Sequence, residues 1–323
     1  CSRDWSSDVC SSDLELGKKV AAALGMELSP VSVKRFPSGE IIAESIETVR
    51  GKNVYIIQST CPPVNENLME LLIFVDSLKR SSAAEINVII PYFGYARQDR
   101  KAKPRQPISA RLVADLLKVS GVTRVVTVDL HAPQIQGFFS CLVDELATAP
   151  LYVATFLQDS HFNTKDLVTV SPDHGGVTRA RKIADGLNTP LAIIDKRRNS
   201  RLEPEVMNII GSVEGKDCLI VDDMIDTAGS ACAAADALIN AGAKSVKIIA
   251  THAVLSDPAF ERLSKSKFNQ IIVSDSIPLP ERFKELNCKV ISLAPMLAAS
   301  IKKIQLGEPL SVVYDMYKVE DHD

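Results

Sequence analysis

Residues 221–230 read VDDMIDTAGS, a stretch that joins a β-branched apolar run to an alanine-rich helical pattern. The backbone amides of the small residues at 226–230 can close around an oxyanion, and the N-terminus of the helix favours negative charge there. Asp222 and Asp223 end the strand pattern, where a pair of carboxylates can accept hydrogen bonds from a vicinal diol. The pattern predicts a site for a ribose that carries a 5-phosphate, whereas a glycine loop alone would indicate a turn with Ser230 as N-cap.

Strand and helix patterns alternate along the rest of the chain. Helical patterns such as ENLMELLIFVDSLKRSSA, residues 66–83, separate several of the expected strands. The alternation predicts an α/β fold in which mostly parallel sheets are flanked by helices. The expected strands are the runs NVYIIQ, INVIIPYF, RVVTVDLH, LVTVSPD, LAIIDK, CLIVDD, VKIIATH, IIVSD and VISLA.

An internal repeat indicates a duplicated domain. Residues 109–131 align without a gap to residues 230–252, and both segments run from a helix through a glycine to a strand and a histidine. The first copy has ten extra residues ahead of its helix, within the basic stretch PYFGYARQDRKAKPRQPI at 91–108. The identical pairs are Ser109/Ser230, Ala110/Ala231, Ala114/Ala235, Asp115/Asp236, Leu117/Leu238, Gly121/Gly242, Val125/Val246 and His131/His252.

Composition limits the partners and the compartment. With 46% hydrophobic residues, 24% charged residues and a net charge of −3, the 323-residue chain gives no reason to expect nucleic acid or a membrane as partner. No apolar run is long enough to span a bilayer, and no GxxxxGK-Ser/Thr phosphate loop occurs. Five cysteines outside residues 1–14, without a CxxC pair, predict neither disulfides nor a zinc site, so a reducing cytoplasm is expected.

Six motifs, in order along the chain, resemble those of the ribose-phosphate pyrophosphokinases, a family with the phosphoribosyltransferase fold. The resemblance covers residues 15–314 and is closest to the bacterial enzymes. It implies two duplicated phosphoribosyltransferase-like domains, 15–146 and 147–304; the first contains a basic flag at 92–108 and is joined by the C-terminal segment 305–317. The motifs are NENLMELLI (65–73), GYARQDRK (94–101), DLHAPQIQGFF (129–139), SPDHGGVTRAR (171–181), DKRR (195–198) and VDDMIDTAGS.

The resemblance implies a reaction and its partners. Members of the family transfer pyrophosphate from ATP to the C1 hydroxyl of ribose 5-phosphate, with Mg²⁺ as cofactor, and form phosphoribosyl pyrophosphate and AMP. The product feeds nucleotide, histidine and tryptophan biosynthesis. A cytoplasmic homo-oligomer, a hexamer, with phosphate as activator and ADP as inhibitor is implied as well.

The resemblance also assigns roles to single residues. Lys196 and Arg198 match the catalytic loop, and His131 and Asp173 match the Mg²⁺ site. Asp173 also opens a loop, with Gly175 and Gly176, whose backbone approaches a pyrophosphate; His174 is assigned no role. The matching ATP-binding residues are Phe36, Ser38, Gly39, Glu40, Arg97 and Gln98. The matching ribose 5-phosphate residues are Arg198, Asp222, Asp223, Asp226, Thr227, Ala228, Gly229 and Ser230.

Plainer alternatives exist for these assignments. The two basic segments can be solvated loops, RFPSGE at 35–40 a turn, and His131 a core histidine like its repeat partner His252. A purine-type phosphoribosyltransferase would share the VDDMIDTAGS loop but has one domain and no basic flag. A catalytically silent regulatory relative would share the whole fold, but the presence of Lys196, Arg198, Asp222 and Asp226 and the lack of an insertion near the catalytic loop count against it.

Three places depart from the family. Residues 1–14, CSRDWSSDVCSSDL, show no regular period and resemble the translation of a sequencing-library adapter, so we treat them as an artefact outside the fold, with a disordered natural tail as the alternative. Family members have a first strand there, so an uncovered sheet edge is expected. In the adenine loop, Ser38 stands where family members commonly have an acidic residue or an amide. At an expected subunit interface, the segment SVVYDM at 311–316 has Asp315 and Met316 in place of apolar residues.

Overall fold

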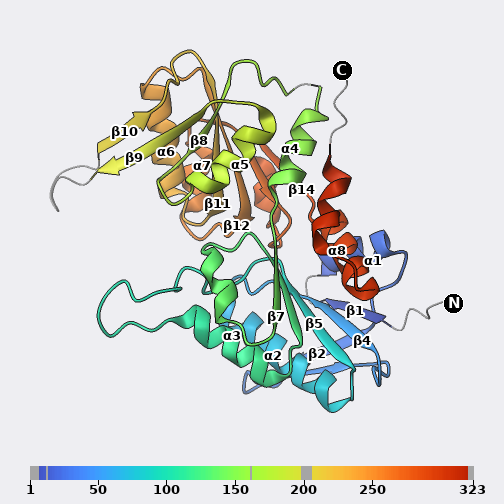
Figure 1. Ribbon diagram of the computed structural model, residues 1–323. Coiled ribbons are helices and arrows are strands. Elements are labelled where there is room, and N and C mark those ends of the chain that lie inside the picture. The colour runs from blue at the N-terminus through green and yellow to red at the C-terminus, as the bar shows by residue number, and fades with distance from the viewer. Residues whose placement is uncertain (1–6, 12–13, 161, 198–205, 319–323) are drawn as a thin grey trace. The chain divides into compact units, whose positions relative to one another are not determined.

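The computed structural model describes residues 7–11, 14–160, 162–197 and 206–318, which divide into two α/β units (Figure 1). Unit 1 comprises the described residues up to Ala147, with Ser276–Pro278 and Leu293–Pro309. Unit 2 comprises Thr148–Asp275, Leu279–Ser292 and the described residues from Leu310 on. The C-terminal segment within unit 1 therefore differs from the predicted 305–317. It carries helix α8 (Ala294–Leu306), which packs against α1 (Leu14–Leu24).

Unit 1 is built on a five-stranded parallel sheet in the order β1-β4-β5-β6-β7. Helices α2 (Val64–Arg80) and α3 (Ser109–Ser120) share a core with one face of this sheet, in which Leu71, Val88 and Leu117 are fully buried. Gln305 of α8 accepts a hydrogen bond of 3.1 Å from the hydroxyl of Tyr55 in β4. The strands are β1 (Ser7–Ser11), β4 (Asn53–Ile57), β5 (Glu85–Ile90), β6 (Arg124–Val128) and β7 (Leu142–Leu146).

β1 pairs with the edge of β4, which was expected to be uncovered, so that expectation is wrong. Residues 7–11 run parallel to β4, with Val9 opposite Tyr55 and Ser11 opposite Ile57. Strand pairing depends on backbone amides and carbonyls, which any segment without proline supplies. The lack of a regular apolar pattern in SDVCS therefore did not prevent it from pairing at the edge.

Unit 2 is built on a seven-stranded sheet in the order β10-β9-β8-β11-β12-β13-β14, in which only the β10–β9 pair is antiparallel. Helices α6 (Gly229–Asn240) and α7 (Ala259–Ser264) share one core with the sheet, while α4 (Ala149–Leu157) and α5 (Val177–Leu187) pack together outside that core. The strands are β8 (Leu167–Ser171), β9 (Leu191–Arg197), β10 (Val206–Ile210), β11 (Asp217–Ile225), β12 (Ser245–Ala253), β13 (Phe268–Ser274) and β14 (Cys288–Ile291).

The internal repeat corresponds to equivalent elements of the two units. In unit 1, α3 ends at a glycine, Gly121, that precedes β6; in unit 2, α6 is followed by Gly242 ahead of β12. Both glycines have positive φ, +126° and +87°, which other residues rarely adopt. The two duplicated α/β domains with mostly parallel sheets that the sequence predicts are thus confirmed. Within the described part of the chain, no helix has the length and apolar character needed to cross a membrane.

Candidate active site

Two loops of unit 2 lie side by side because the strands before them are neighbours. β8 and β11 are parallel and paired, with Val170 opposite Ile220, so their carboxyl ends open at one edge of the sheet. The glycine loop at 172–176 follows β8. β11 continues past the end of β8, paired with β12, and carries Asp222 and Asp223 beyond the last residue that pairs with β8.

The loop after β11 has the geometry of an anion site. Ala228 adopts a left-handed conformation, with φ +59°, and α6 begins at the next residue, so the first amides of the helix face no partner of their own helix. Arg262 of α7 donates a hydrogen bond of 2.9 Å to the carbonyl of Thr227. A Cβ atom on Gly229 would lie 3.1 Å from the same guanidinium, so Arg262 packs closely over the start of α6. Arg262 lies 35 residues downstream, and no sequence motif indicated its role.

The paired carboxylates are held by their own strand and by α5. Asp223 is 4% exposed, and its Oδ1 lies 3.5 Å from Nη1 of Arg179. The backbone amide of Asp223 donates to Oδ1 of Asp222 over 2.9 Å. Burial, and then the charge of Asp223, raise the pKa of Asp222 from 3.8 to about 8. Arg179, which makes this contact, lies inside the motif SPDHGGVTRAR, and the sequence analysis assigned it no role.

Replacing Asp222 with asparagine is expected to stabilise unit 2 increasingly as the pH rises. A raised pKa means that the folded protein keeps a proton that the unfolded chain releases, so the stability from this group is complete below pH 3.8 and is lost as the pH rises to about 8. Asparagine does not titrate. Thermal unfolding would be measured at pH 5, 7 and 9. The melting temperature of Asp222→Asn minus that of the wild type should increase from pH 5 to pH 9.

A matched control is Asp166→Asn. The hydrogen bond and charge of Lys216 lower the pKa of Asp166, so this carboxylate stays ionised throughout the same pH range. Its substitution should shift the melting temperature by a constant amount between pH 5 and 9. A constant difference for Asp222→Asn as well would contradict the raised pKa.

The glycine loop is closed by its own hydrogen bonds. Oδ1 of Asp173 accepts from the amide of Gly176 over 2.9 Å, and the hydroxyl of Ser171 donates to the carbonyl of Asp173 over 2.7 Å. A Cβ atom on Gly176 would lie 3.0 Å from the Ser171 hydroxyl oxygen, and one on Gly175 would lie 3.3 Å from Oδ1 of Asp173. Because the loop is this tight and leads directly into α5, its backbone can approach an anion closely.

The backbone position of Lys196, one of the two predicted catalytic residues, lies next to this loop, on the other side of β8. β9 is the neighbour of β8 in the sheet and contains Lys196, whose side chain is not among the described groups. Arg198 lies outside the described residues. The backbone of β9 thus brings the position of Lys196 to the same sheet edge as the two loops.

Unit 1 carries the predicted ATP-binding residues of the basic flag. Arg97 and Gln98 are exposed in the segment 91–108, which follows β5. The Gln98 side chain accepts a hydrogen bond of 2.6 Å from Ser109, the first residue of α3. Asp99 accepts one of 2.6 Å from Gln134, in the 3-10 helix η1 (Pro133–Phe138) that follows His131. The flag is therefore anchored at the sheet edge where β5 and β6 end.

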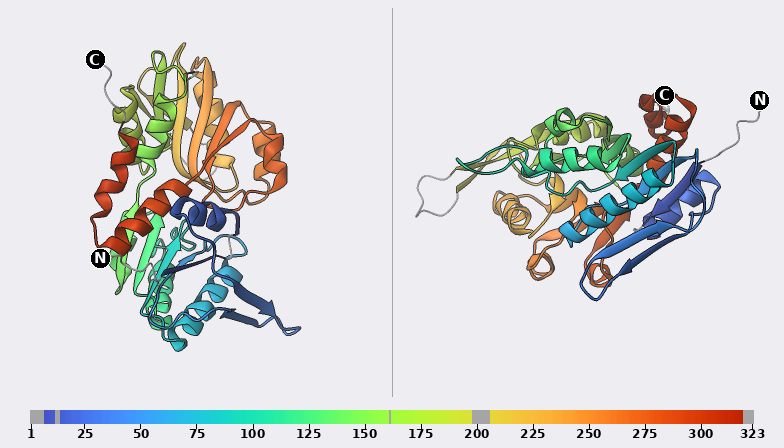
Figure 2. Two further views of the ribbon diagram at one scale, coloured as in Figure 1. Left: turned by 90° about the vertical axis from the view of Figure 1, so that its right-hand side faces the viewer. Right: turned by 90° about the horizontal axis from the view of Figure 1, so that it is seen from below.

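The predicted adenine loop is the turn of a hairpin between β2 (Val31–Arg35) and β3 (Ile41–Ser45), which projects from the main sheet of unit 1 (Figure 2). Phe36 is 51% exposed there, and Gly39 has φ +92°. The Ser38 hydroxyl donates to Glu40 over 2.7 Å. An exposed aromatic ring on a short, ordered turn is suited to stacking on a base.

The two predicted Mg²⁺ ligands belong to different units. His131 is exposed and follows β6 in unit 1, whereas Asp173 is exposed in the glycine loop of unit 2. Among the described residues, no three His, Cys, Asp or Glu side chains gather closely enough to hold a metal ion. A lone carboxylate beside a phosphate site fits Mg²⁺, which keeps several waters and takes its other ligands from substrate phosphates.

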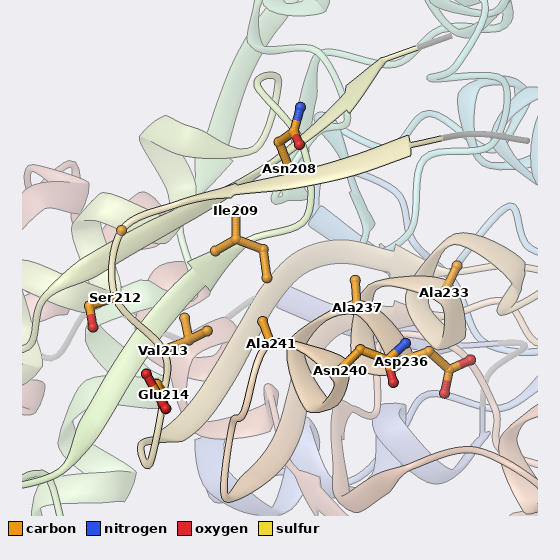
Figure 3. Close-up of a pocket in the computed structure, with 11 residues that line it drawn as sticks. Asn208, Ile209, Ser212, Val213, Glu214, Ala233, Asp236, Ala237, Asn240 and Ala241 are labelled. Carbon is orange, nitrogen blue, oxygen red and sulfur yellow. The ribbon is translucent and has the colours of Figure 1, made fainter. Parts of the chain in front are cut away.

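A groove of about 810 Å³ between β10 and α6 is a separate feature (Figure 3). Ile209, Ala237 and Ala241 form its apolar part, and Glu214 and Asp236 contribute two carboxylates. Among the described residues that line it there is no lysine or arginine, so this lining is poorly suited to a phosphate. The predicted site residues whose side chains are described do not line it either, and we do not assign it to the active site.

Comparison with known families gives two matches that together cover most of the chain. Residues 9–121 match the N-terminal domain of ribose phosphate pyrophosphokinase, and residues 143–281 match the phosphoribosyl transferase domain. The first match begins inside β1. A single-domain purine-type phosphoribosyltransferase would not account for the N-terminal match.

Individual relatives agree with the family matches over almost their whole length. The chain is 53% identical over 305 residues to the ribose-phosphate pyrophosphokinase of Fusobacterium nucleatum, covering 94% of this chain and 96% of the relative. It is 53% identical to that of Caldanaerobacter subterraneus over 304 residues, with the same coverage of both chains. Among solved structures, the phosphoribosylpyrophosphate synthetase of Mycobacterium smegmatis aligns with a TM-score of 0.88 and 42% identity, over 93% of this chain and 99% of that one.

Proposed function

The chain belongs to the ribose-phosphate pyrophosphokinase family, and from this premise we infer that it transfers the pyrophosphoryl group of ATP to the C1 hydroxyl of ribose 5-phosphate. A bond forms between the C1 oxygen and the β-phosphorus of ATP, and the bond from that phosphorus to the bridging oxygen of the α-phosphate breaks. The products are phosphoribosyl pyrophosphate and AMP. They serve nucleotide, histidine and tryptophan biosynthesis.

The loop after β11 is proposed to bind ribose 5-phosphate, and it is the observation that carries the function. The amides at Thr227–Ser230 and the start of α6 would bind the 5-phosphate, with the loop braced by Arg262. Asp222 and Asp223 would accept hydrogen bonds from the ribose hydroxyls. The Arg179 contact at 3.5 Å supports this role, because it holds Asp223 at the sheet edge. Asp226 stands between the two parts of the site and is proposed to contact the ligand with Arg198.

The flag and the hairpin are proposed to bind ATP. Arg97 can bind phosphate oxygens bidentately, and Gln98 can hydrogen-bond the nucleotide. Phe36 would stack on adenine, with Ser38, Gly39 and Glu40 forming the rest of the turn. The family's reaction uses a metal ion, and we propose Mg²⁺ held by His131 and Asp173, where it would neutralise phosphate charge.

The transfer step is proposed to depend on cations and on the backbone of the glycine loop in unit 2. Attack on the β-phosphorus places negative charge on oxygens of the transferring group. Asp173, Gly175 and Gly176 form the loop whose backbone would approach this group, and Lys196 and Arg198 would stabilise its charge and exclude water. Lys196 on β9 and the glycine loop after β8 stand at one sheet edge, which supports this division of work.

Assembly, regulation and compartment are proposals that rest on the family alone. We propose a cytoplasmic homo-oligomer, a hexamer, activated by phosphate and inhibited by ADP. The segment 311–316 lies in η3 (Leu310–Tyr317), where Met316 is 50% exposed and Asp315 pairs with Lys318 over 2.7 Å. An exposed methionine at this place is compatible with a contact to a second copy.

Formation of AMP and phosphoribosyl pyrophosphate from ATP, Mg²⁺ and ribose 5-phosphate is the expected result of the test for this function. The chain would be assayed as it stands, with each of the three inputs omitted in turn and with the metal removed by a chelator. Product should require all three. A folded protein that forms no product under these conditions would contradict the proposal and favour a catalytically silent relative.

A further inference from the structure

A contact between His174 and Asp195 ties the glycine loop to strand β9. Nε2 of His174 lies 2.9 Å from Oδ1 of Asp195. Since a carboxylate oxygen accepts, the imidazole N–H is the donor. The histidine side chain is 64% exposed, whereas that of Asp195 is only 12% exposed. A mostly buried carboxylate therefore holds an exposed ring that rises from the loop.

The strand register explains why these two residues meet. β8 and β9 are parallel, with Ser171 opposite Ile193 as the last pair. Asp195 lies two residues farther along β9, on the same face as Ile193, at the level where β8 has already turned into the glycine loop. On its other side β9 pairs with β10, where Asn208 stands opposite Asp195, so the backbone of the acceptor is held by β10.

The contact differs in kind from the other hydrogen bonds of the loop. The bonds from Gly176 to Asp173 and from Ser171 to Asp173 join residues of one continuous segment, so they set the loop's own curvature. The bond from His174 reaches another strand, 21 residues away along the chain. Asp195 is also the residue immediately before Lys196.

We propose that His174 is a positioning residue that latches the glycine loop to β9 and so sets the distance between the loop backbone and Lys196. This inference rests on the proposed function, in which the loop backbone and the lysine act on the same pyrophosphoryl group. Without the hydrogen bond from His174 to Asp195, the loop would keep its shape through its own hydrogen bonds, but its distance from β9 would vary. Misplacement of one of two cooperating parts lowers the rate of the step more than substrate binding.

The latch predicts a change in turnover with little change in the binding of ribose 5-phosphate. His174→Phe keeps a ring but removes the donor, and loss of one such hydrogen bond should lower kcat by about tenfold. KM for ribose 5-phosphate should stay within about twofold, because its site is on β11 and α6. His174→Gln can place an amide N–H near the position of Nε2 and should recover most of the turnover, whereas the shorter His174→Asn should not.

The second partner provides a double-mutant test. Asp195→Ala, which removes the acceptor, should reproduce the loss of turnover, and the double variant His174→Phe with Asp195→Ala should be no slower than the slower single variant, because one interaction is lost only once. Since His174 is exposed, its variants should melt close to the wild type. Their kinetics test the latch even if Asp195→Ala fails to fold.

The outcomes separate the latch from the function on which it rests. A wild type that forms no phosphoribosyl pyrophosphate overturns the proposed function, and the latch with it. An active wild type whose turnover is matched by His174→Phe overturns the latch alone. Equal losses in the Phe and Gln variants, or losses that multiply in the double variant, also overturn it; rescue by Gln together with a non-additive double variant supports it.

Discussion

Replacing Lys196 with alanine is expected to lower turnover by about 100-fold or more while ATP binding changes little. The charge that the lysine would stabilise develops on the transferring group, so the interaction is stronger in the transition state than with bound substrate. ATP would still be held by the flag and the hairpin of unit 1. Initial rates of AMP formation, together with equilibrium binding of ATP to the variant, would measure the two effects separately.

The control is a lysine of the same unit that has no place in the site. Lys265 is 73% exposed and pairs with Glu261 over 2.8 Å within α7 and its C-terminal cap. Such surface pairs contribute about 0–1 kcal/mol, so Lys265→Ala should leave turnover and the melting temperature almost unchanged. If turnover of Lys196→Ala were as high as that of Lys265→Ala, the catalytic role of Lys196 would be wrong.

Replacing Gly94 with alanine is expected to damage both the stability of unit 1 and its binding of ATP. A Cβ atom at this position would lie 2.4 Å from the carbonyl oxygen of Thr60 and 3.1 Å from Val64. The nearest atom belongs to the backbone, so the chain itself must move. The amide of Gly94 also donates to the Thr60 hydroxyl over 2.6 Å, and this bond would be strained or lost.

Gly94 is the first residue of the motif GYARQDRK, which contains Arg97 and Gln98. Its displacement would therefore move the flag and these two residues. Overpacking of this kind costs about 1–3 kcal/mol, which corresponds to a fall of roughly 2–10 °C in the melting temperature. KM for ATP should rise about tenfold or more, while KM for ribose 5-phosphate changes little. Thermal unfolding and substrate titrations measure the three quantities.

Gly137→Ala is the matched control for Gly94→Ala. Gly137 also belongs to unit 1, in η1, yet a Cβ atom there would meet nothing within 4 Å, and its φ is not positive. Its melting temperature and KM for ATP should stay near those of the wild type. A Gly94→Ala variant that behaves like this control would show that the segment after β5 tolerates displacement, against the anchoring described for the flag.

Local patterns were sufficient for most of the fold. Apolar runs such as those of β8 and β11 are buried on both faces, so their periodicity and length identify parallel strands without knowledge of their partners. Gly121 and Gly242 mark the equivalent helix ends in both copies, because the positive φ required there favours glycine. The segment at residues 7–11 was misjudged, since an edge strand that pairs through its backbone needs no apolar pattern.

The sequence by itself determined the duplicated α/β architecture and the family, and it predicts that a phosphorylated ribose binds at the loop VDDMIDTAGS. Those features depend on residues close together in the chain, where helix starts, turns and strand periods are local properties. Only the tertiary structure decided which distant groups support the loops: Arg179 beside Asp223, Arg262 on Thr227, and Asp195 on His174. Strand order and register bring these pairs together, and neither is written in a single segment, because each depends on how separate elements pack.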